Sequence, residues 1–371
     1  MRTLKRIIAL MAVLTLVATA CGDDDATETT DAPATTAAAT DAPATTAPAT
    51  TAAAPAEPTA IRVQLNWTAD TGFLGLYVAD DMGYFAEEDV APTFEYGGPN
   101  VPHPTQILAG GAADIGFGGL WSVAEAVNQG NDYVMLGARM QVQPLGISSL
   151  PDEPILTAAD LCDKQIGLTP GDVVALDALL VVNGLEAGCY DMVPIGYDPS
   201  PLAEGLVAGL VNYMNSHPVI LDAQGIENIA VSYGELGAPS YHDIMFVRRD
   251  FLDANRDAVV GFTRAMVKGW EYALENPQYA IDLMMSEKWG GTEIGMDPTI
   301  QPAIHEAQIP LITSDLTDEK GLFWMDLDAL GGVMYNLLEL GGMEPPPLET
   351  ITDLSILEDA FDGCEPSILN C

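Results

Sequence analysis

Two large aromatic residues, Trp67 and Phe73, lie in the loop that follows the first predicted strand. Flat aromatic side chains bind flat ligands by offset stacking, which adds about 0.5–1.5 kcal/mol per ring pair beyond the burial of area. Before the loop, apolar Ile61, Val63 and Leu65 alternate with polar residues, which predicts a strand. Apolar residues at helical spacing follow the loop and predict a helix: Leu74, Tyr77, Val78, Met82 and Phe85. This loop is therefore a candidate binding site.

Further candidate residues follow other predicted strands. In open parallel sheets, ligands bind outside the carboxyl ends of the strands, where loops meet the N-termini of helices. Amide and hydroxyl side chains in such loops could pair with the edge of a heterocycle. The predicted ligand-binding residues are Asn66, Trp67, Phe73, Gly119, Trp121, Gln141, Thr169, Asp172, Asn215 and Ser216.

A structural role is the alternative for several of these residues. Trp67, Phe73 and Trp121 could pack in the core or on the surface of a lobe. Asn215 and Ser216 could cap the helix that follows them. The sequence leaves these alternatives open.

Strand and helix patterns alternate along most of the chain, which predicts βαβ units and mostly parallel sheets. We expect an α/β protein of two lobes, each a mostly parallel sheet flanked by helices, with a ligand cleft between them. The first lobe is predicted to comprise residues 60–150 and 245–371, and the second residues 151–244. Segments that cross between the lobes, near 141–152 and 242–249, would form a hinge.

The N-terminal residues 1–20 have the basic, apolar and small-residue order of a secretory signal peptide. Their apolar stretch is shorter than the roughly 20 residues that a membrane-spanning helix needs. The segment "ATAC" resembles a bacterial lipobox, so we expect lipidation of Cys21 and anchoring to the outer face of the cell membrane. Residues 21–59 are predicted to form a disordered linker, because they lack the Leu, Ile, Val and aromatic residues of a core.

The formal net charge of −41 excludes nucleic acid as an expected partner, because the phosphate backbone is repelled by such a surface. None of the predicted cleft loops contains Lys or Arg. A site for a sulfonate, nitrate or phosphate anion would be expected to place such a residue there. The sequence therefore favours a neutral, flat, aromatic ligand.

Four cysteines remain besides Cys21, an even number that predicts two disulfides in an exported protein. Three connectivities are open, and the local pairs Cys162–Cys189 and Cys364–Cys371 are favoured. No spacing typical of a zinc site is present among them, so we expect no metal.

Four stretches in order resemble the NMT1/THI5-like substrate-binding proteins of ABC transporters, over about residues 61–285. They are "LNWTADTGFLGLYVADDMGYF", "ILAGGAADIGFGG", "ILTAADLCDKQIGL" and "MVKGWEYALENPQYAIDLM". The resemblance implies a type II periplasmic-binding fold with the ligand between two α/β lobes. The spacing of Trp67 and Phe73 is similar to that of the riboflavin-binding branch, whereas the pyrimidine-precursor binders often have His at the position of Phe73. Asn212 departs from the pattern, because the family usually has Asp there.

The resemblance implies a monomeric solute-binding protein of an ABC importer, whose partners are a small-molecule ligand, a permease and an ATPase. The ligand would be riboflavin-like or thiamine-pyrimidine-like. A sulfonate, taurine or nitrate binder of the same fold is one alternative, and a sensor that signals to a receptor is another.

Some relatives on this fold are enzymes that make the thiamine pyrimidine from pyridoxal phosphate and a histidine. That chemistry needs a reactive Lys and a Cys-rich segment, and the predicted cleft loops of this chain contain neither. We therefore expect no enzymatic activity and no cofactor.

Overall fold

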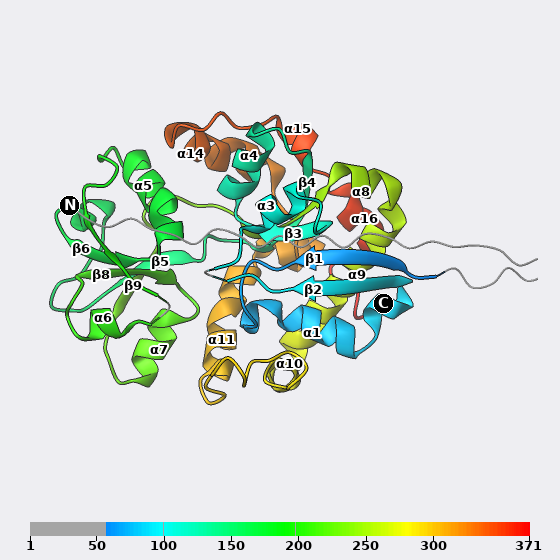
Figure 1. Cartoon of the computed structure of the whole chain (residues 1–371), viewed down its shortest axis with the longest axis horizontal. Coiled ribbons are helices and arrows are strands. Elements are labelled where there is room, and N and C mark those ends of the chain that lie inside the picture. The colour runs from blue at the N-terminus through cyan, green and yellow to red at the C-terminus, as the bar shows by residue number, and fades with distance from the viewer. Residues whose placement is uncertain (1–56, 99, 197) are drawn as a thin grey trace, which may run out of the picture. The chain divides into compact units, whose positions relative to one another are not determined.

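Within the described residues, two five-stranded sheets form the framework of the protein (Figure 1). The computed structural model describes residues 57–98, 100–196 and 198–371, so the expected signal peptide, Cys21 and most of the linker lie outside the described residues. The first sheet has the order β2-β1-β3-β10-β4, and the second has the order β7-β6-β8-β5-β9. The strands are β1 (Thr59–Gln64), β2 (Val90–Glu95), β3 (Ile115–Gly118), β4 (Tyr133–Met140), β5 (Leu145–Ser149), β6 (Gln165–Leu168), β7 (Asp191–Pro194), β8 (Gly209–Tyr213), β9 (Ile229–Ser232) and β10 (His242–Arg248).

One strand of each sheet runs antiparallel to both of its neighbours. β10 is antiparallel to β3 and β4, and β5 is antiparallel to β8 and β9, while the other pairs are parallel. Both strands belong to the segments that pass from one lobe to the other. β5 is part of the second sheet, so the second lobe begins before the predicted boundary at residue 151, because Leu145–Ser149 pairs with Gly209–Tyr213.

Helices flank both sheets. Those of the first lobe are η1 (Thr71–Phe73), α1 (Leu74–Asp81), α2 (Tyr84–Glu87), α3 (Pro104–Ala109), α4 (Leu120–Asn128), α8 (Arg249–Ala254), α9 (Arg256–Glu275), α10 (Pro277–Met284), α11 (Gln301–Ile312), α12 (Asp315–Lys320), α13 (Leu327–Ala329), η4 (Leu330–Met334), α14 (Tyr335–Leu340), α15 (Leu348–Ile351) and α16 (Ser355–Phe361). Those of the second lobe are η2 (Ala158–Leu161), η3 (Pro170–Asp172), α5 (Val173–Val182), α6 (Ser200–Ala203) and α7 (His217–Ala223).

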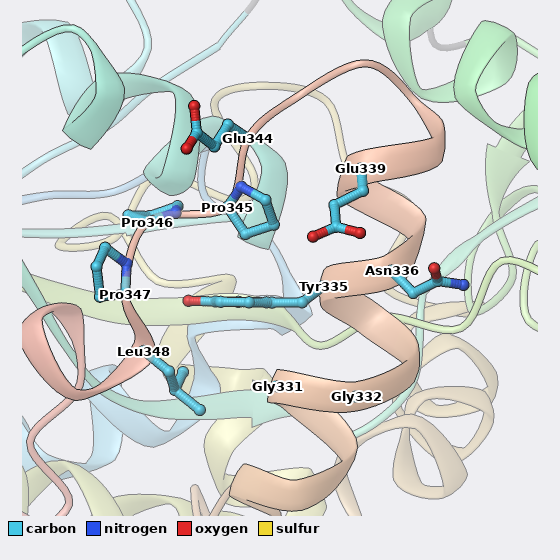
Figure 2. Close-up of a pocket in the computed structure, with 10 residues that line it drawn as sticks. All are labelled: Gly331, Gly332, Tyr335, Asn336, Glu339, Glu344, Pro345, Pro346, Pro347 and Leu348. Atoms are coloured by element: carbon cyan, nitrogen blue, oxygen red, sulfur yellow. The ribbon is translucent and has the colours of Figure 1, made fainter.

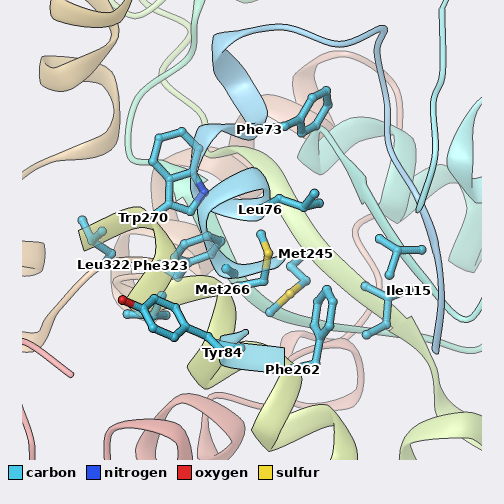
Figure 3. Packing of buried hydrophobic residues seen from close by; sticks show 14 of the residues in the cluster. Phe73, Leu76, Tyr84, Ile115, Met245, Phe262, Met266, Trp270, Leu322 and Phe323 are labelled. Carbon is cyan, nitrogen blue, oxygen red and sulfur yellow. The ribbon is translucent and has the colours of Figure 1, made fainter. Parts of the chain in front are cut away.

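The core of the first lobe depends on a close approach between α1 and α9. A Cβ atom at Gly75 would lie 2.3 Å from the Trp270 ring, and one at Gly269 would lie 2.1 Å from the carbonyl oxygen of Gly75. Larger residues at either position would push the helices apart. Figure 3 shows Trp270 among the buried residues of this core.

Two disulfides fasten loops at the edges of the lobes. Cys162 is bonded to Cys189 in the second lobe, and Cys364 is bonded to Cys371 near the C-terminus. Among the residues that the structure describes, no helix has both the length and the apolar character needed to cross a bilayer.

Candidate functional site

The candidate site is organised around Asp243, which lies near the start of β10. Its Oδ1 atom accepts a hydrogen bond from Asn66 Nδ2 at 2.7 Å and one from His242 Nδ1 at 3.0 Å. Its Oδ2 atom pairs with Arg139 of β4. The backbone of Asp243 has a φ of +46°, a left-handed conformation that Asp adopts more readily than most residues. Residues of the loop after β1, of β4 and of β10 therefore all contact the Asp243 carboxylate.

Arg139 is 5% exposed, and several contacts compensate for the burial of its charge. Besides its ion pair with Asp243, its Nη1 atom donates to Gln308 Oε1 of α11 at 3.4 Å. Its guanidinium lies 5.1 Å from the centre of the Trp270 ring, a distance that allows a cation–π interaction. We call Asn66, Arg139, His242, Asp243 and Gln308 the Arg139–Asp243 network.

The network fixes the charge of Asp243. Burial by itself would raise the pKa of this carboxyl, because low-dielectric surroundings disfavour the ionised form. Arg139 and His242 outweigh that cost and hold the pKa of Asp243 well below its usual range. The Arg139–Asp243 pair is therefore an ion pair at neutral pH.

A second carboxyl of the first lobe, Asp70, lies in the loop between β1 and η1. Its Oδ1 atom accepts a hydrogen bond from the backbone N–H of Gly72 at 2.8 Å. Burial raises its pKa to about 7, and the Asp243 charge acts in the same direction, against the opposing effects of the Gly72 hydrogen bond and of Arg139. Asp70 thus changes its charge near neutral pH.

The second lobe reaches the same region through β8 and through the loop after β6. The Tyr213 ring at the end of β8 lies edge-on to the His242 ring, with 5.9 Å between the ring centres. Burial raises the pKa of Tyr213 well above its usual value, and the charges of Asp243, Asp172 and Asp70 raise it further. Residues of both lobes therefore share one electrostatic environment.

Asp172 is the carboxyl that the second lobe contributes. Its Oδ2 atom accepts a hydrogen bond from Thr169 Oγ1 at 2.8 Å, within the same loop. Burial raises the pKa of Asp172, while the Thr169 hydrogen bond and His242 of the first lobe oppose the shift. The charge of Asp172 thus interacts with His242 of the first lobe.

Two glycines at the end of β3 let two histidines approach the site. A Cβ atom at Gly119 would lie 3.2 Å from the His242 ring, and one at Gly118 would lie 3.1 Å from His103 Cε1. Burial, together with the nearby His242, lowers the pKa of His103 to about 4. Gly119 therefore belongs beside the site because it leaves room for His242.

Three predicted site residues lie in structural positions instead. Phe73 is 6% exposed and is part of the core around α1. Trp121 packs against the end of α14, where a Cβ atom at Gly341 would lie 2.6 Å from its ring. Gln141 Nε2 donates to the carbonyl oxygens of Ala138 and Trp324, and its Oε1 accepts from Ser314 Oγ. For these three residues the structural alternative explains the contacts, so we withdraw them from the candidate site.

The remaining predicted residues have mixed surroundings. Trp67 is partly buried against the first-lobe core, and its carbonyl oxygen accepts a hydrogen bond from Gly97 N at 3.0 Å. Asn215, two residues after Tyr213, is 7% exposed, and its Oδ1 atom is buried without a hydrogen-bond partner among the described residues. Ser216 Oγ donates to the Tyr213 carbonyl oxygen at 3.3 Å, which is a local structural contact.

Five residues of the site were missed from the sequence: Asp70, Arg139, Tyr213, His242 and Asp243. The predicted cleft loops contain no Lys or Arg, but Arg139 lies within the strand β4, which those loops do not include. The charged residue inside the apolar run "YVMLGARM" was the available signal, because a lone Arg in a buried strand needs a partner.

A separate hollow of about 660 Å³ lies elsewhere on the first lobe (Figure 2). It is lined by residues of η4, α14 and the proline-rich segment after them, with the Tyr335 ring beside Pro345. None of the predicted binding residues lines it. In the part of the chain that the structure describes, no group of three or more His, Cys, Asp or Glu side chains is arranged to hold a metal ion.

The fold is that of the periplasmic binding proteins. The alkanesulfonate-binding protein SsuA from Xanthomonas axonopodis pv. citri, solved with bound MOPS, superimposes with a TM-score of 0.59 and 15% identity, over 80% of this chain and 99% of that one. The model of the family described as NMT1/THI5 like matches residues 70–280. The chain therefore belongs to the NMT1/THI5-like family.

Two binding proteins are similar to this chain in sequence. The riboflavin-binding protein RibY of Chloroflexus aurantiacus is 27% identical over 331 residues, which cover 86% of this chain and 88% of that protein. The formylaminopyrimidine-binding protein of Halalkalibacterium halodurans is 23% identical over 271 residues, which cover 71% of this chain and 79% of that protein.

A third relative corrects the expectation that the chain is not an enzyme. The 4-amino-5-hydroxymethyl-2-methylpyrimidine phosphate synthase of Legionella pneumophila subsp. pneumophila is 23% identical over 234 residues, which cover 62% of this chain and 73% of that protein. The matched family includes enzymes, so the exclusion of an enzyme from the sequence was wrong. The physical reason is that a missing Lys or Cys cluster excludes one mechanism and not a whole class of activity.

Proposed function

We propose that this protein is a solute-binding protein of an ABC importer, which captures a small ligand between its two lobes and delivers it to a permease. The observation that carries the proposal is the edge-on contact between the Tyr213 ring of the second lobe and the His242 ring of the first, beside Asp243. Groups from two separate sheets are brought to one buried region, which is where a two-lobed protein can enclose a ligand. The membership of the family and the names of the two similar binding proteins support the same role.

The ligand of the proposal is a flat aromatic heterocycle, either riboflavin-like or thiamine-pyrimidine-like. Trp67 would supply a stacking surface beside Asn66, which is already a member of the Arg139–Asp243 network. The two similar binding proteins carry riboflavin and formylaminopyrimidine in their names, and both compounds are flat heterocycles.

A small anion such as a sulfonate is less well supported as the ligand. Within the described residues, the guanidinium of the Arg139–Asp243 network is Arg139, and Asp243 already neutralises it. An anion would have to compete with this buried pair, and breaking such a pair leaves an uncompensated charge at a cost of about 3–5 kcal/mol.

The proposal places the protein outside the cell membrane, as a monomer held by a lipid on Cys21 and a linker up to residue 59. The motivating observation is the signal-peptide pattern that ends at Cys21. We expect mass spectrometry of the mature N-terminus to find diacylglyceryl-modified Cys21. An unmodified N-terminus at another residue would contradict the anchor.

The binding role is tested by native mass spectrometry of the protein purified from producing cells, before and after mild denaturation. We expect a bound small molecule in the first spectrum that is absent from the second. The refolded protein is then screened against a broad set of vitamins, vitamin precursors and sulfonates by thermal melting. If no compound is retained and none raises the melting temperature, the solute-binding role is contradicted.

A further inference from the structure

Gln308 of α11 is completely buried and joins residues from several elements of the first lobe. Its Oε1 atom accepts a hydrogen bond from Arg139 Nη1 of β4 at 3.4 Å. Its Nε2 atom donates to the carbonyl oxygen of Thr71, at the start of η1, at 3.0 Å. The same nitrogen forms a hydrogen bond with His305 Nδ1 of α11 at 2.9 Å. One side chain therefore connects Arg139 to the loop after β1.

The chemistry of these partners fixes which way the Gln308 amide faces. A guanidinium has hydrogen-bond donors and no acceptor, so Arg139 must meet the amide oxygen. A backbone carbonyl has acceptor lone pairs and no donor, so Thr71 must meet the amide nitrogen. An amide turned the other way would place donor against donor and acceptor against acceptor, which is costly for buried groups. The partners of Gln308 therefore allow one orientation.

The orientation of the amide fixes the position of the proton on His305. The Nδ1 atom of the ring faces an N–H donor, so it must accept, and a neutral imidazole that accepts at Nδ1 carries its proton on Nε2. Burial lowers the pKa of His305, which keeps the ring neutral at pH 7 and above. The residue is 3% exposed, and its Nε2 atom has no hydrogen-bond partner among the described residues. The tautomer is thus set by Gln308 and not by a partner at Nε2.

His242, on the other side of the ion pair, must carry a proton on the opposite ring nitrogen. Its Nδ1 atom faces Oδ1 of Asp243, and an ionised carboxylate accepts hydrogen bonds but cannot donate them. His242 therefore donates from Nδ1. The Arg139–Asp243 network thus predicts different proton positions for the two histidines that flank it.

The loop after β1 lies against Arg139 close to the point where Gln308 holds it. A Cβ atom at Gly72 would lie 3.3 Å from Arg139 Nη2, and Gly72 N donates to Asp70 Oδ1 at 2.8 Å. Helix α11, which carries Gln308, contacts η1, β4 and, in the second lobe, α7. The hydrogen bond to Thr71 thus fastens this turn to a helix that also reaches the other lobe.

We propose that Gln308 is a positioning residue of the candidate site, whose amide fixes the loop after β1 against Arg139 and holds the proton of His305 on Nε2. The proposal rests on the proposed function in one respect, because it takes the Arg139–Asp243 network as part of the binding site. The hydrogen bonds lie within the chain, so both tests use ligand-free protein. Their failure would leave the solute-binding role intact, and failure of the ligand screen would leave the arrangement of Gln308 intact.

The first test determines the histidine tautomers by nitrogen-15 nuclear magnetic resonance at pH 8, on protein with labelled histidines that is refolded free of ligand. The signals are assigned from their loss in His305→Gln and His242→Gln. We expect a proton on Nε2 of His305 and on Nδ1 of His242 in the unchanged protein. A proton on Nδ1 of His305 would overturn the proposal, and this result needs no variant of Gln308.

Gln308→Glu should move the proton of His305 to Nδ1, because a carboxylate can accept a hydrogen bond there but cannot donate one. Gln64→Glu is the matched control, because Gln64 is a buried glutamine of the same lobe whose amide donates to backbone carbonyl oxygens alone. The control should leave the His305 tautomer unchanged, and circular dichroism checks that each variant is folded. A His305 tautomer that is the same in Gln308→Glu as in the unchanged protein would also overturn the proposal.

The second test measures the link between Gln308 and Arg139 by a double-mutant cycle of urea unfolding. Gln308→Met and Arg139→Met are made singly and together. We expect the unfolding constant of the double variant to depart from the product of the single effects by about 3- to 100-fold, as for residues of one hydrogen-bond network. Equal effects, combined as a simple product, would show that Gln308 does not position Arg139.

Gln301→Met is the matched control for this cycle. Gln301 is a buried glutamine on the same helix, about two turns from Gln308, and its amide donates to the carbonyl oxygen of Asp297. Its effect should combine with that of Arg139→Met to within about 2-fold of the product. If the cycle with Gln301 departs from the product as far as the cycle with Gln308 does, the coupling is not specific to Gln308 and the proposal is wrong.

Discussion

The two lobes contribute to the candidate site in different ways. On the first lobe, Asn66, Arg139 and His242 hold Asp243 through hydrogen bonds that are complete without a ligand. On the second lobe, Asp172 accepts a hydrogen bond from Thr169 of its own loop, and Tyr213 contacts the His242 ring of the first lobe. The difference indicates that the first lobe is the preorganised half of the site. We expect the second lobe to gain partners when the lobes enclose a ligand.

The elements that carry these residues explain the contrast. Arg139 and Asp243 lie on the neighbouring strands β4 and β10, and Gln308 lies on α11, so their positions are fixed by the sheet and its helices. Asp172 instead lies in the short η3 segment that follows β6. Sites on strands and helices are held more precisely than sites on loops.

The largest effect should come from removing the cation of the first lobe. Arg139→Met leaves Asp243 buried without its partner, which typically destabilises a protein by about 3–5 kcal/mol. Urea unfolding of the ligand-free protein measures this loss. Lys164→Met, which removes a solvent-exposed pair with Glu153 on the second lobe, should cost at most about 1 kcal/mol. Similar losses for the two variants would show that the network does not organise the first lobe.

Variants of Trp67 and Phe73, in the loop after β1, should affect different properties: ligand binding in one case and stability in the other. Trp67→Ala should weaken binding of the cognate heterocycle by about 2–4 kcal/mol, as for a hot-spot residue, while Trp67→Phe keeps a stacking surface and much of the affinity. Phe73→Ala, in the same loop but in the core, should instead lower stability by about 3–5 kcal/mol. Calorimetry and thermal melting measure the two effects. If Trp67→Ala unfolds the ligand-free protein, Trp67 is a core residue.

The raised pKa of Asp70 makes stability depend on pH. A carboxyl whose pKa is raised from 3.8 to about 7 on folding binds its proton more tightly in the folded state. The stabilisation that this tighter proton binding provides is complete below the pKa of Asp70 in the unfolded chain. It is lost as the pH rises through about 7, the pKa in the folded state. The change is at most about 1.4 kcal/mol per pH unit. Asp70→Asn should therefore be more stable than the unchanged protein at high pH, with a gap that shrinks as the pH falls.

The comparison of the two proteins by urea unfolding at pH 5 and pH 8 checks this prediction. The other titrating groups are common to both proteins, so their effects cancel in the difference. A gap that grows as the pH falls would mean that the pKa of Asp70 is not raised by burial.

The smallest effect is expected on the second lobe. Tyr213→Phe removes one hydroxyl that lies among the site carboxyls, and it should weaken ligand binding by about 1 kcal/mol through one lost hydrogen bond. Stability of the ligand-free protein should stay nearly unchanged, because Phe keeps the ring that contacts His242. A stability loss comparable to that of Arg139→Met would remove the distinction between the lobes.

The sequence predicted much of the fold, because the evidence for it is local. The alternation around Ile61 and Val63 predicted β1, and the spacing after the loop predicted α1. The strand Leu145–Ser149 was assigned to the wrong lobe, because its five residues are all buried and nothing in their pattern distinguishes one sheet from the other.

The site was predicted less completely, because it depends on pairs that are far apart in the sequence. Asp243 pairs with Arg139, 104 positions away, and with Asn66, 177 positions away. No local pattern predicts which buried charges meet across strands. The loop rule selected Asn66, Thr169 and Asp172, which lie in the loops after β1 and β6, and their role in binding stays a prediction. It also selected Phe73, which is buried in the core around α1.

The most direct test of the account is the distance between the lobes with and without ligand. Spin labels are attached at Glu125→Cys on α4 and Glu204→Cys at the end of α6, both exposed positions on different lobes. Double electron–electron resonance spectroscopy should show a broad distance distribution without ligand, and a narrower distribution at a shorter mean distance with the heterocycle bound. A control pair within the first lobe, Glu125→Cys and Glu319→Cys, should not change. If the distance between the lobes is the same at saturating ligand, the claim that both lobes enclose the ligand is wrong.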